Sequence, residues 1–182
     1  VRVNPVNEII EEMKQLYEMG VRGFWFTDAQ FIPTKNHIQD AKLLLQAIKD
    51  QGWTDLKWAA YIRADNIDRE LAQLMVETGM SYFEIGITSG SQELVRKMQL
   101  AYNLKTVLEN CRMLVEAGFR NHVSVNYSFN VFDETPNTIK QTIAYHRELE
   151  NIFGKGLVDP AIFFIGLQPH TLLEKYALEN NI

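Results

Sequence analysis

The chain has 182 residues, of which 46% are hydrophobic and 23% charged, and its formal net charge at pH 7 is −5. This length supports one domain with a sizeable core. The acidic balance argues against a nucleic-acid partner, which would need a basic face, and no apolar run reaches the roughly 18 residues of a membrane span. With Cys111 as its only cysteine, the chain can form neither an internal disulfide nor a cysteine-based metal site.

These properties predict a single domain over residues 1–182 that binds a small molecule in a reducing cytoplasm. Val1 stands where a complete chain would begin with Met, and no basic and apolar signal precedes the first apolar pattern. We therefore expect the chain to be a piece of a longer protein.

Apolar spacing and stop signals predict alternating helices and strands in the first half of the chain. Helices are expected over 4–20, 38–49 and 68–79, and strands over 23–27 and 56–62. Asp68 is the expected cap of the third helix. Leu43, Leu44 and Ile48 are expected to form the core face of the second.

The second half continues the alternation. Strands are expected over 82–87, 122–129 and 161–165, with helices over 92–98, 103–118, 138–153 and 172–178. The turn from Thr88 to Ser91 separates the first of these strands from its helix, with Ser91 as the expected N-cap, and Asn103 is expected to cap the next helix.

Strands that alternate with helices indicate a parallel sheet with right-handed crossovers. An open doubly wound sheet and a full or partial β/α barrel both fit this order. Polar side chains follow every predicted strand, which favours the barrel, because a barrel gathers such residues in a ring at one face. They are Asp28 and Gln30, Arg63 and Asp65, Thr88 and Ser89, Asn130 and Glu134, and Gln168 and His170.

The same segments resemble the radical S-adenosylmethionine (SAM) superfamily. The resemblance lies in Phe-Thr-Asp-Ala-Gln-Phe at 26–31, Arg-Ala-Asp-Asn-Ile-Asp at 63–68, Gly-Ile-Thr-Ser-Gly-Ser at 86–91 and Asp-Glu-Thr at 133–135. The ordered set looks most like the branch in which a cobalamin-binding domain often precedes the barrel, that of the anaerobic magnesium-protoporphyrin monomethyl ester cyclase. It implies an α/β fold: a partial TIM-like barrel of parallel strands whose first strand and cluster loop are missing from this chain.

The resemblance implies SAM and a four-iron, four-sulfur cluster as cofactors, with the three cluster cysteines outside this chain. It leaves open whether cobalamin also takes part. It further implies an oxidoreductase or cyclase that generates a 5′-deoxyadenosyl radical, or that carries out cobalamin-linked methyl transfer or oxidative cyclisation. The implied substrate is an organic molecule, a tetrapyrrole in the branch named above, and the implied reductant is a protein such as flavodoxin or ferredoxin. The chain alone is expected to be inactive.

The resemblance also assigns the site residues. Asp28, Ala29 and Gln30 would lie at the methionyl amino group, while Arg63, Thr88 and Ser89 would face the ribose and carboxylate. The remaining assignments place Asn126, Ser128 and Asn130 near the adenine or substrate, and Gln168 and His170 at the substrate. No catalytic residue and no metal ligand are assigned within the chain.

Structural interpretations stand beside these assignments. Arg63 and Asp65 could pair with each other, and Thr88 and Ser89 could serve only the turn. Glu84 lies within an apolar strand, so it either points into the barrel or pairs with a cation such as Arg22 or Lys57. We favour a satisfied structural role for it, because an unpaired buried carboxylate is costly.

Other functions also remain open. A metal-independent barrel lyase would need a strand lysine, for which Lys57 is the one candidate. A non-catalytic barrel that binds or scaffolds is the other alternative. A sheet that lacks its first strand leaves an exposed edge, so we also expect self-association through it.

Overall fold

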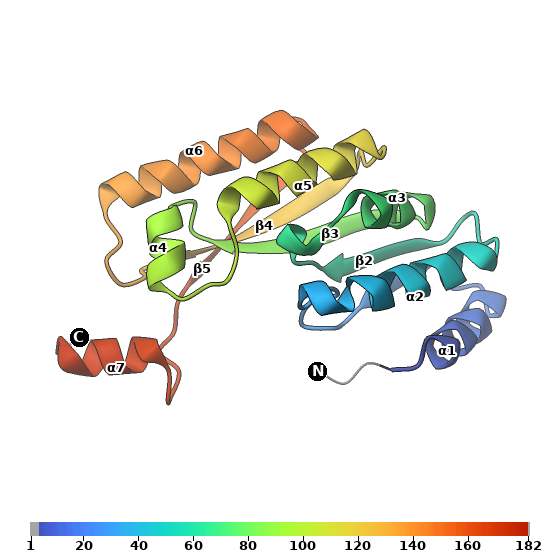
Figure 1. Cartoon of the computed structure of the whole chain (residues 1–182), viewed down its shortest axis with the longest axis horizontal. Helices are drawn as coiled ribbons and strands as arrows, with labels where there is room; N and C mark the ends of the chain where they lie inside the picture. The colour runs from blue at the N-terminus through green and yellow to red at the C-terminus, as the bar shows by residue number, and fades with distance from the viewer. Residues whose placement is uncertain (1–3, 182) are drawn as a thin grey trace.

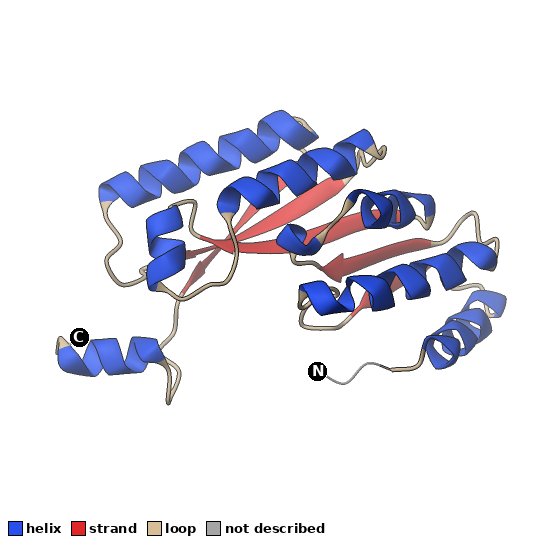
Figure 2. Ribbon diagram, viewed as in Figure 1, coloured by secondary structure: helices blue, strands red, loops and turns tan. Residues whose placement is uncertain are grey.

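Five parallel strands form one sheet in the computed structural model, which describes residues 4–181 (Figures 1 and 2). Val1 lies outside the described residues. The strands are β1 (Gly23–Phe26), β2 (Lys57–Tyr61), β3 (Met80–Thr88), β4 (His122–Phe129) and β5 (Val158–Phe164). The helices are α1 (Val6–Glu18), α2 (Ile38–Asp50), α3 (Arg69–Glu77), α4 (Gln92–Lys97), α5 (Leu104–Glu116), α6 (Pro136–Phe153) and α7 (Leu172–Glu179), with short 3-10 helices η1 (Lys35–His37) and η2 (Ala64–Asn66).

The strands lie in the order β1-β2-β3-β4-β5, so each pairs with its neighbours in sequence and the order never reverses. Helices α2, α3, α5 and α6 all lie over one face of the twisted sheet (Figure 1). A doubly wound sheet would reverse its order and carry helices on both faces. The arrangement is therefore the wall of a partial β/α barrel, as the resemblance implied.

Alternation along β3 shows which side chains face each way. Phe83, Ile85 and Ile87 are buried beneath the helices, whereas Tyr82, Glu84 and Gly86 alternate with them on the opposite face. We call that opposite face the inner face, because it would line the interior of a closed barrel.

The core beneath the helices is apolar and rich in aromatic rings. Phe83, Phe119 and Phe153 pack edge to face around one another, with ring centroids 5.2 to 6.0 Å apart. Trp58 is also buried, and its indole N–H donates to the Thr78 hydroxyl at 3.0 Å. This layer fixes the strands and hence the positions of the loops that follow them.

One predicted helix detail is wrong, and a second holds for the position of the residue but not for its hydrogen bond. Leu43 is 53% exposed, and Leu45 faces the core in its place, because the core stripe of α2 runs through Ala41, Leu44, Leu45 and Ile48. Ser91 occupies the N-cap position of α4, but its side chain makes no capping hydrogen bond.

The caps Asp68 and Asn103 are confirmed. The Asp68 side chain accepts a hydrogen bond from the backbone N–H of Leu71, and the Asn103 side chain accepts from those of Lys105 and Thr106.

Within residues 4–181, none of the helices combines the length and the apolar character that crossing a bilayer requires.

Candidate functional site at the strand ends

The parallel sheet brings the carboxyl ends of all five strands to one edge. The polar residues predicted from the sequence follow these strand ends, so the fold gathers their loops at one end of the molecule. The structure nevertheless gives them different environments: some are open, some are strained and some are already paired.

Gln30 follows β1 and lines a small cavity of about 130 Å³ between the β1 loop and helices α1 and α2. Its side-chain Oε1 is buried and has no hydrogen-bond donor among the described residues. Asp28 lines the same cavity and is exposed, as is Ala29. A buried acceptor without a donor costs free energy, and a water molecule or a ligand in this cavity would remove that cost.

Arg63 follows β2 and pairs with Asp65. The Arg63 Nε donates to Asp65 Oδ1 at 3.0 Å, and the Arg63 Nη2 donates to Asp65 Oδ2 at 2.7 Å. The guanidinium also donates to the Ala101 carbonyl at 2.9 Å. The structural interpretation of this pair is confirmed: Arg63 ties the η2 turn to the loop that leads into α5.

Four residues in the loops after β3, β4 and β5 have left-handed backbones although none is glycine. Thr88, Asn130, Asp133 and His170 have φ values of 57°, 63°, 60° and 64°. Asn, Asp and His adopt this conformation more readily than other residues with side chains, whereas it is costly for β-branched threonine. Glu134 accepts from the Asn130 N–H at 2.9 Å, and Glu174 accepts from the His170 N–H at 2.7 Å. Backbone strain is therefore greatest at Thr88.

Ser89 follows Thr88 but is only 2% exposed. Its Oγ accepts from the Ser91 N–H at 3.1 Å and lies 3.4 Å from the Thr142 hydroxyl oxygen. Ser89 therefore fixes the turn against α6. Behind this turn, the Tyr102 hydroxyl donates to the Ile87 carbonyl, and burial raises the pKa of Tyr102 to about 12.

Asn126 lies on the inner face of β4, beside Glu84 of β3. Its Nδ2 donates to Glu84 Oε2 at 3.3 Å, and its Oδ1 is buried with no donor among residues 4–181. The Tyr82 hydroxyl donates to the other Glu84 oxygen at 3.1 Å. Of the two alternatives for Glu84, the structure shows the first, in which it points toward the barrel interior. The pairing with a cation is not found, because Arg22 pairs with Asp55 at 2.7 Å and no described ion pair joins Glu84 to Lys57. Ser128 lies half-buried further along β4 on the same face as Asn126.

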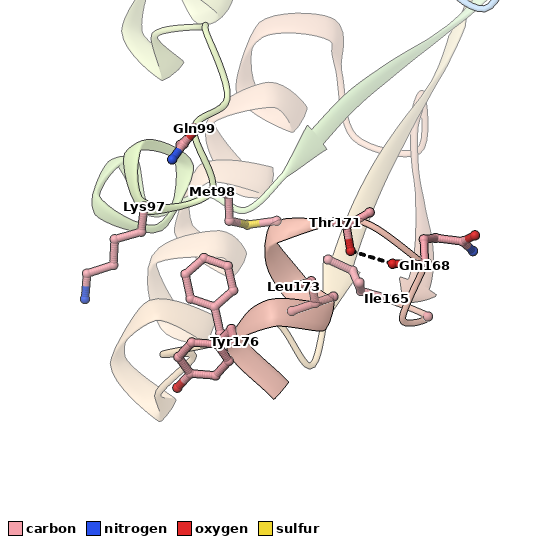
Figure 3. Close-up of a pocket in the computed structure, with 10 residues that line it drawn as sticks. Lys97, Met98, Gln99, Ile165, Gln168, Thr171, Leu173 and Tyr176 are labelled. Atoms are coloured by element: carbon pink, nitrogen blue, oxygen red, sulfur yellow. Dashed lines mark hydrogen bonds between the residues drawn. The ribbon is translucent and has the colours of Figure 1, made fainter. Parts of the chain in front are cut away.

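A larger cavity of about 620 Å³ lies between the end of α4, the β4 and β5 loops and α7 (Figure 3). Gln168 lines it, and its carbonyl accepts from the Thr171 hydroxyl at 2.7 Å. His170 is exposed and is not among the lining residues. The apolar lining was not predicted; it comes mostly from Met98, Phe132, Ile165, Leu173 and Tyr176. The only signal in the sequence for this apolar lining is the presence of apolar residues, such as Phe132 and Ile165, at or just after the ends of the predicted strands.

A metal cluster would need ligands from elsewhere. No three His, Cys, Asp or Glu side chains lie together as a metal site within residues 4–181. Cys111, the one cysteine of the sequence, is buried on α5, and burial raises the pKa of its thiol to about 12. A thiol held protonated in a core is not available as a metal ligand.

A family model described as the radical SAM superfamily matches residues 1–146. No curated protein matches the chain. Among solved structures, the radical SAM methyltransferase TsrM from Kitasatospora setae, with cobalamin and a [4Fe-4S] cluster bound, is 21% identical with a TM-score of 0.80, over 97% of this chain and 32% of that protein.

Two further structures share the fold. The cobalamin-dependent SAM radical enzyme OxsB is 15% identical with a TM-score of 0.65, over 99% of this chain and 26% of that protein. Coproporphyrinogen III oxidase from Escherichia coli is 13% identical with a TM-score of 0.61, over 90% of this chain and 38% of that protein. The chain thus spans between 26% and 38% of the length of these proteins.

Proposed function

The chain belongs to the radical SAM superfamily, and we propose that it is the part of such an enzyme that holds SAM along the barrel wall. The proposal rests chiefly on one observation: the Gln30 side chain buries an oxygen that has no donor among the described residues. SAM carries an ammonium group at its methionyl end, and that group is a donor of the kind that this oxygen lacks.

The residues present fit SAM in this way. Gln30, with Asp28 and Ala29 beside it, would receive the methionyl ammonium, and Asn126, with Ser128 and Asn130, would lie toward the adenine or the substrate. Thr88 lies in a strained turn beside them, while Arg63 and Ser89 position the loops through the contacts described above. Gly86 adds room, because a side-chain carbon placed there would meet nothing within 4 Å.

The chain does not fit the cluster, since it has one cysteine and that thiol is buried. We propose that the cluster ligands lie outside this sequence and that residues 1–182 alone are inactive. When bound, cluster and SAM supply a 5′-deoxyadenosyl radical. The residues of this chain bind and orient the SAM and exclude water around it.

We further propose that the enzyme uses cobalamin. Two of the structural neighbours are cobalamin enzymes by description, TsrM and OxsB, which supports cobalamin as a further cofactor here. Methyl transfer or an oxidative cyclisation of an organic molecule would then be the reaction, with a tetrapyrrole as one candidate substrate and Gln168 and His170 on its side. A flavodoxin or ferredoxin in the cytoplasm would deliver the electron.

The test uses the full-length protein, reconstituted anaerobically with iron and sulfide. We expect a reduced cluster signal in electron paramagnetic resonance that changes when SAM is added, together with formation of 5′-deoxyadenosine. A protein that takes up no cluster and cleaves no SAM would overturn the proposal. The barrel would then be a binding module.

A further inference from the structure

Three aromatic side chains form a wall on the inner face of the sheet, on β1, β2 and β3. The ring of Trp25 lies 5.7 Å from those of Tyr61 and Tyr82, edge-on to the first and tilted to the second. Trp25 is 42% exposed and Tyr61 is 37% exposed. Large rings left this open on a sheet face offer their surfaces to a ligand.

A carboxylate without a cation lies beside this wall. Glu84 pairs across the sheet with Tyr61, and it receives hydrogen bonds only from neutral groups, Tyr82 and Asn126. The proximity of its charge is the main cause that raises the pKa of Tyr61. A charged carboxylate held on a half-buried surface is stabilised by a cation, and no described ion pair supplies one.

The Asn126 amide strengthens this demand. Its Nδ2 faces Glu84, which leaves Oδ1 buried and without a donor. Turning the amide over would set Oδ1 against the carboxylate, so the observed orientation is the favourable one. The unused acceptor and the unpaired carboxylate lie side by side, and together they provide a place for a group that donates several hydrogen bonds and carries a positive charge.

We propose that Trp25, Tyr61, Tyr82 and Glu84, with Asn126, bind a protonated amine on the substrate. An ammonium group satisfies both acceptors, and its neighbouring carbons are attracted to the aromatic faces, the combination found in protein sites for organic cations. This inference rests on the proposed function, because it takes the bound amine to be the substrate. It adds the substrate class, which is an organic molecule with a protonated amine.

The position along β3 separates this site from the strand end. Glu84 precedes Thr88 by four residues, which is about 13 Å of extended strand. Gly86 lies between them on the same face with open space in front of it. A ligand whose amine is at Glu84 can therefore extend along the strand toward the loops that we assign to SAM.

The experiment measures binding of two probes of one shape to the full-length protein by isothermal titration calorimetry at pH 7. Phenethylamine carries an ammonium group at this pH, and 2-phenylethanol replaces it with a neutral hydroxyl. We expect the amine to bind about tenfold more tightly than the alcohol. The Glu84→Gln variant should remove that preference.

The control is Asp55→Asn. Asp55 lies in the turn before β2 and already pairs with Arg22 at 2.7 Å. This variant should keep the preference within twofold. If Glu84→Gln fails to fold, Trp25→Leu serves in its place and should weaken amine binding about fivefold.

Equal binding of the two probes, or an unchanged preference in Glu84→Gln, would overturn the proposal and indicate that another part of the protein covers this face. The assay needs neither cluster nor SAM. A failure here is therefore distinguishable from a failure of SAM cleavage, which would overturn the proposed function.

Discussion

Thr88 illustrates how the site is built at the scale of single residues. Its left-handed backbone, with φ of 57°, is one that β-branched side chains rarely adopt, and the hydrogen bond from Tyr102 to the preceding carbonyl of Ile87 holds the strand end in place. Strain of this kind costs about 1 to 3 kcal/mol. We infer that it persists because the loop must present this residue to a ligand.

Replacing Thr88 with glycine should therefore stabilise the fold and weaken SAM binding. Relief of strain outweighs the greater flexibility of glycine in the unfolded chain, for a net gain of about 1 kcal/mol. Urea denaturation of the variant and the wild type gives the free energy of unfolding. A loss of stability in Thr88→Gly would show that the turn is not strained.

Gly90 shows a second requirement of the same turn. A side-chain carbon at Gly90 would lie 2.5 Å from the Thr142 Cα and 2.7 Å from the Tyr145 Cβ. Gly90→Ala should therefore lower the free energy of unfolding by about 1 to 3 kcal/mol as α6 is pushed away. Gly86→Ala is the control, because nothing lies within 4 Å of the added carbon, and it should change the thermal midpoint little. Similar losses in both variants would contradict this packing.

Several assignments at this scale were beyond the reach of the sequence. The resemblance placed Gln30, Thr88 and Asn126 at strand exits. The structure shows that Asn126 instead lies within β4 on the inner face, and that Gln30 and Asn126 bury unpaired oxygens. The resemblance could not show that Arg63 is occupied by Asp65 or that Ser89 turns into the core. Those outcomes depend on side-chain rotamers and on contacts with residues distant in sequence.

At the scale of elements, the sequence predicted every strand and every α-helix, because apolar runs and stop signals are local. Asn103 and Ser91 both occupy their predicted N-cap positions, but only the Asn103 side chain makes the capping hydrogen bonds. The N-cap position depends on local sequence, but the hydrogen bond depends on the side-chain rotamer. The prediction that Leu43 faces the core was wrong because three leucines follow one another in α2. Of the three, only Leu44 and Leu45 lie on its buried face.

Buried thiol and phenol groups around α5 and α6 make the free energy of unfolding depend on pH. Burial raises the pKa of Cys111 on α5 from 9.0 to about 12 and that of Tyr102, just before α5, from 10.0 to about 12. Burial also raises the pKa of Tyr127 and of Tyr145. The folded state then keeps protons that the unfolded state loses, so stability is full below about pH 9 and falls as pH rises toward 12.

The thiol titrates first in the unfolded chain, so Cys111→Ala should flatten the decline between pH 9 and 10. Each such group contributes a slope of up to about 1.4 kcal/mol per pH unit. Urea denaturation at half-unit steps measures the slope, and the constant loss from the smaller side chain does not affect it. An identical slope in wild type and variant would contradict the burial of this thiol in the folded state.

At the scale of the whole molecule, the sheet has two open edges. Strands β1 and β5 each pair with one neighbour only, and Ile162, Phe163 and Phe164 on β5 are exposed. An unpaired strand edge with apolar side chains is a template for association. The 182-residue chain alone should therefore self-associate, with a sedimentation coefficient that increases with concentration. A monomer at high concentration would contradict this expectation.

The central claim is that the strand-end loops of this chain hold SAM, and the most direct test is the dissociation constant of SAM for the full-length protein and for Gln30→Leu. Loss of an acceptor for a charged donor costs about 1.5 to 3 kcal/mol, so SAM should bind at least about tenfold more weakly. Gln46→Leu is the matched control, since Gln46 lies on the surface of α2 and bonds only to Asp50 at 2.8 Å, and its affinity for SAM should equal that of the wild type. An unchanged dissociation constant in Gln30→Leu would contradict the claim.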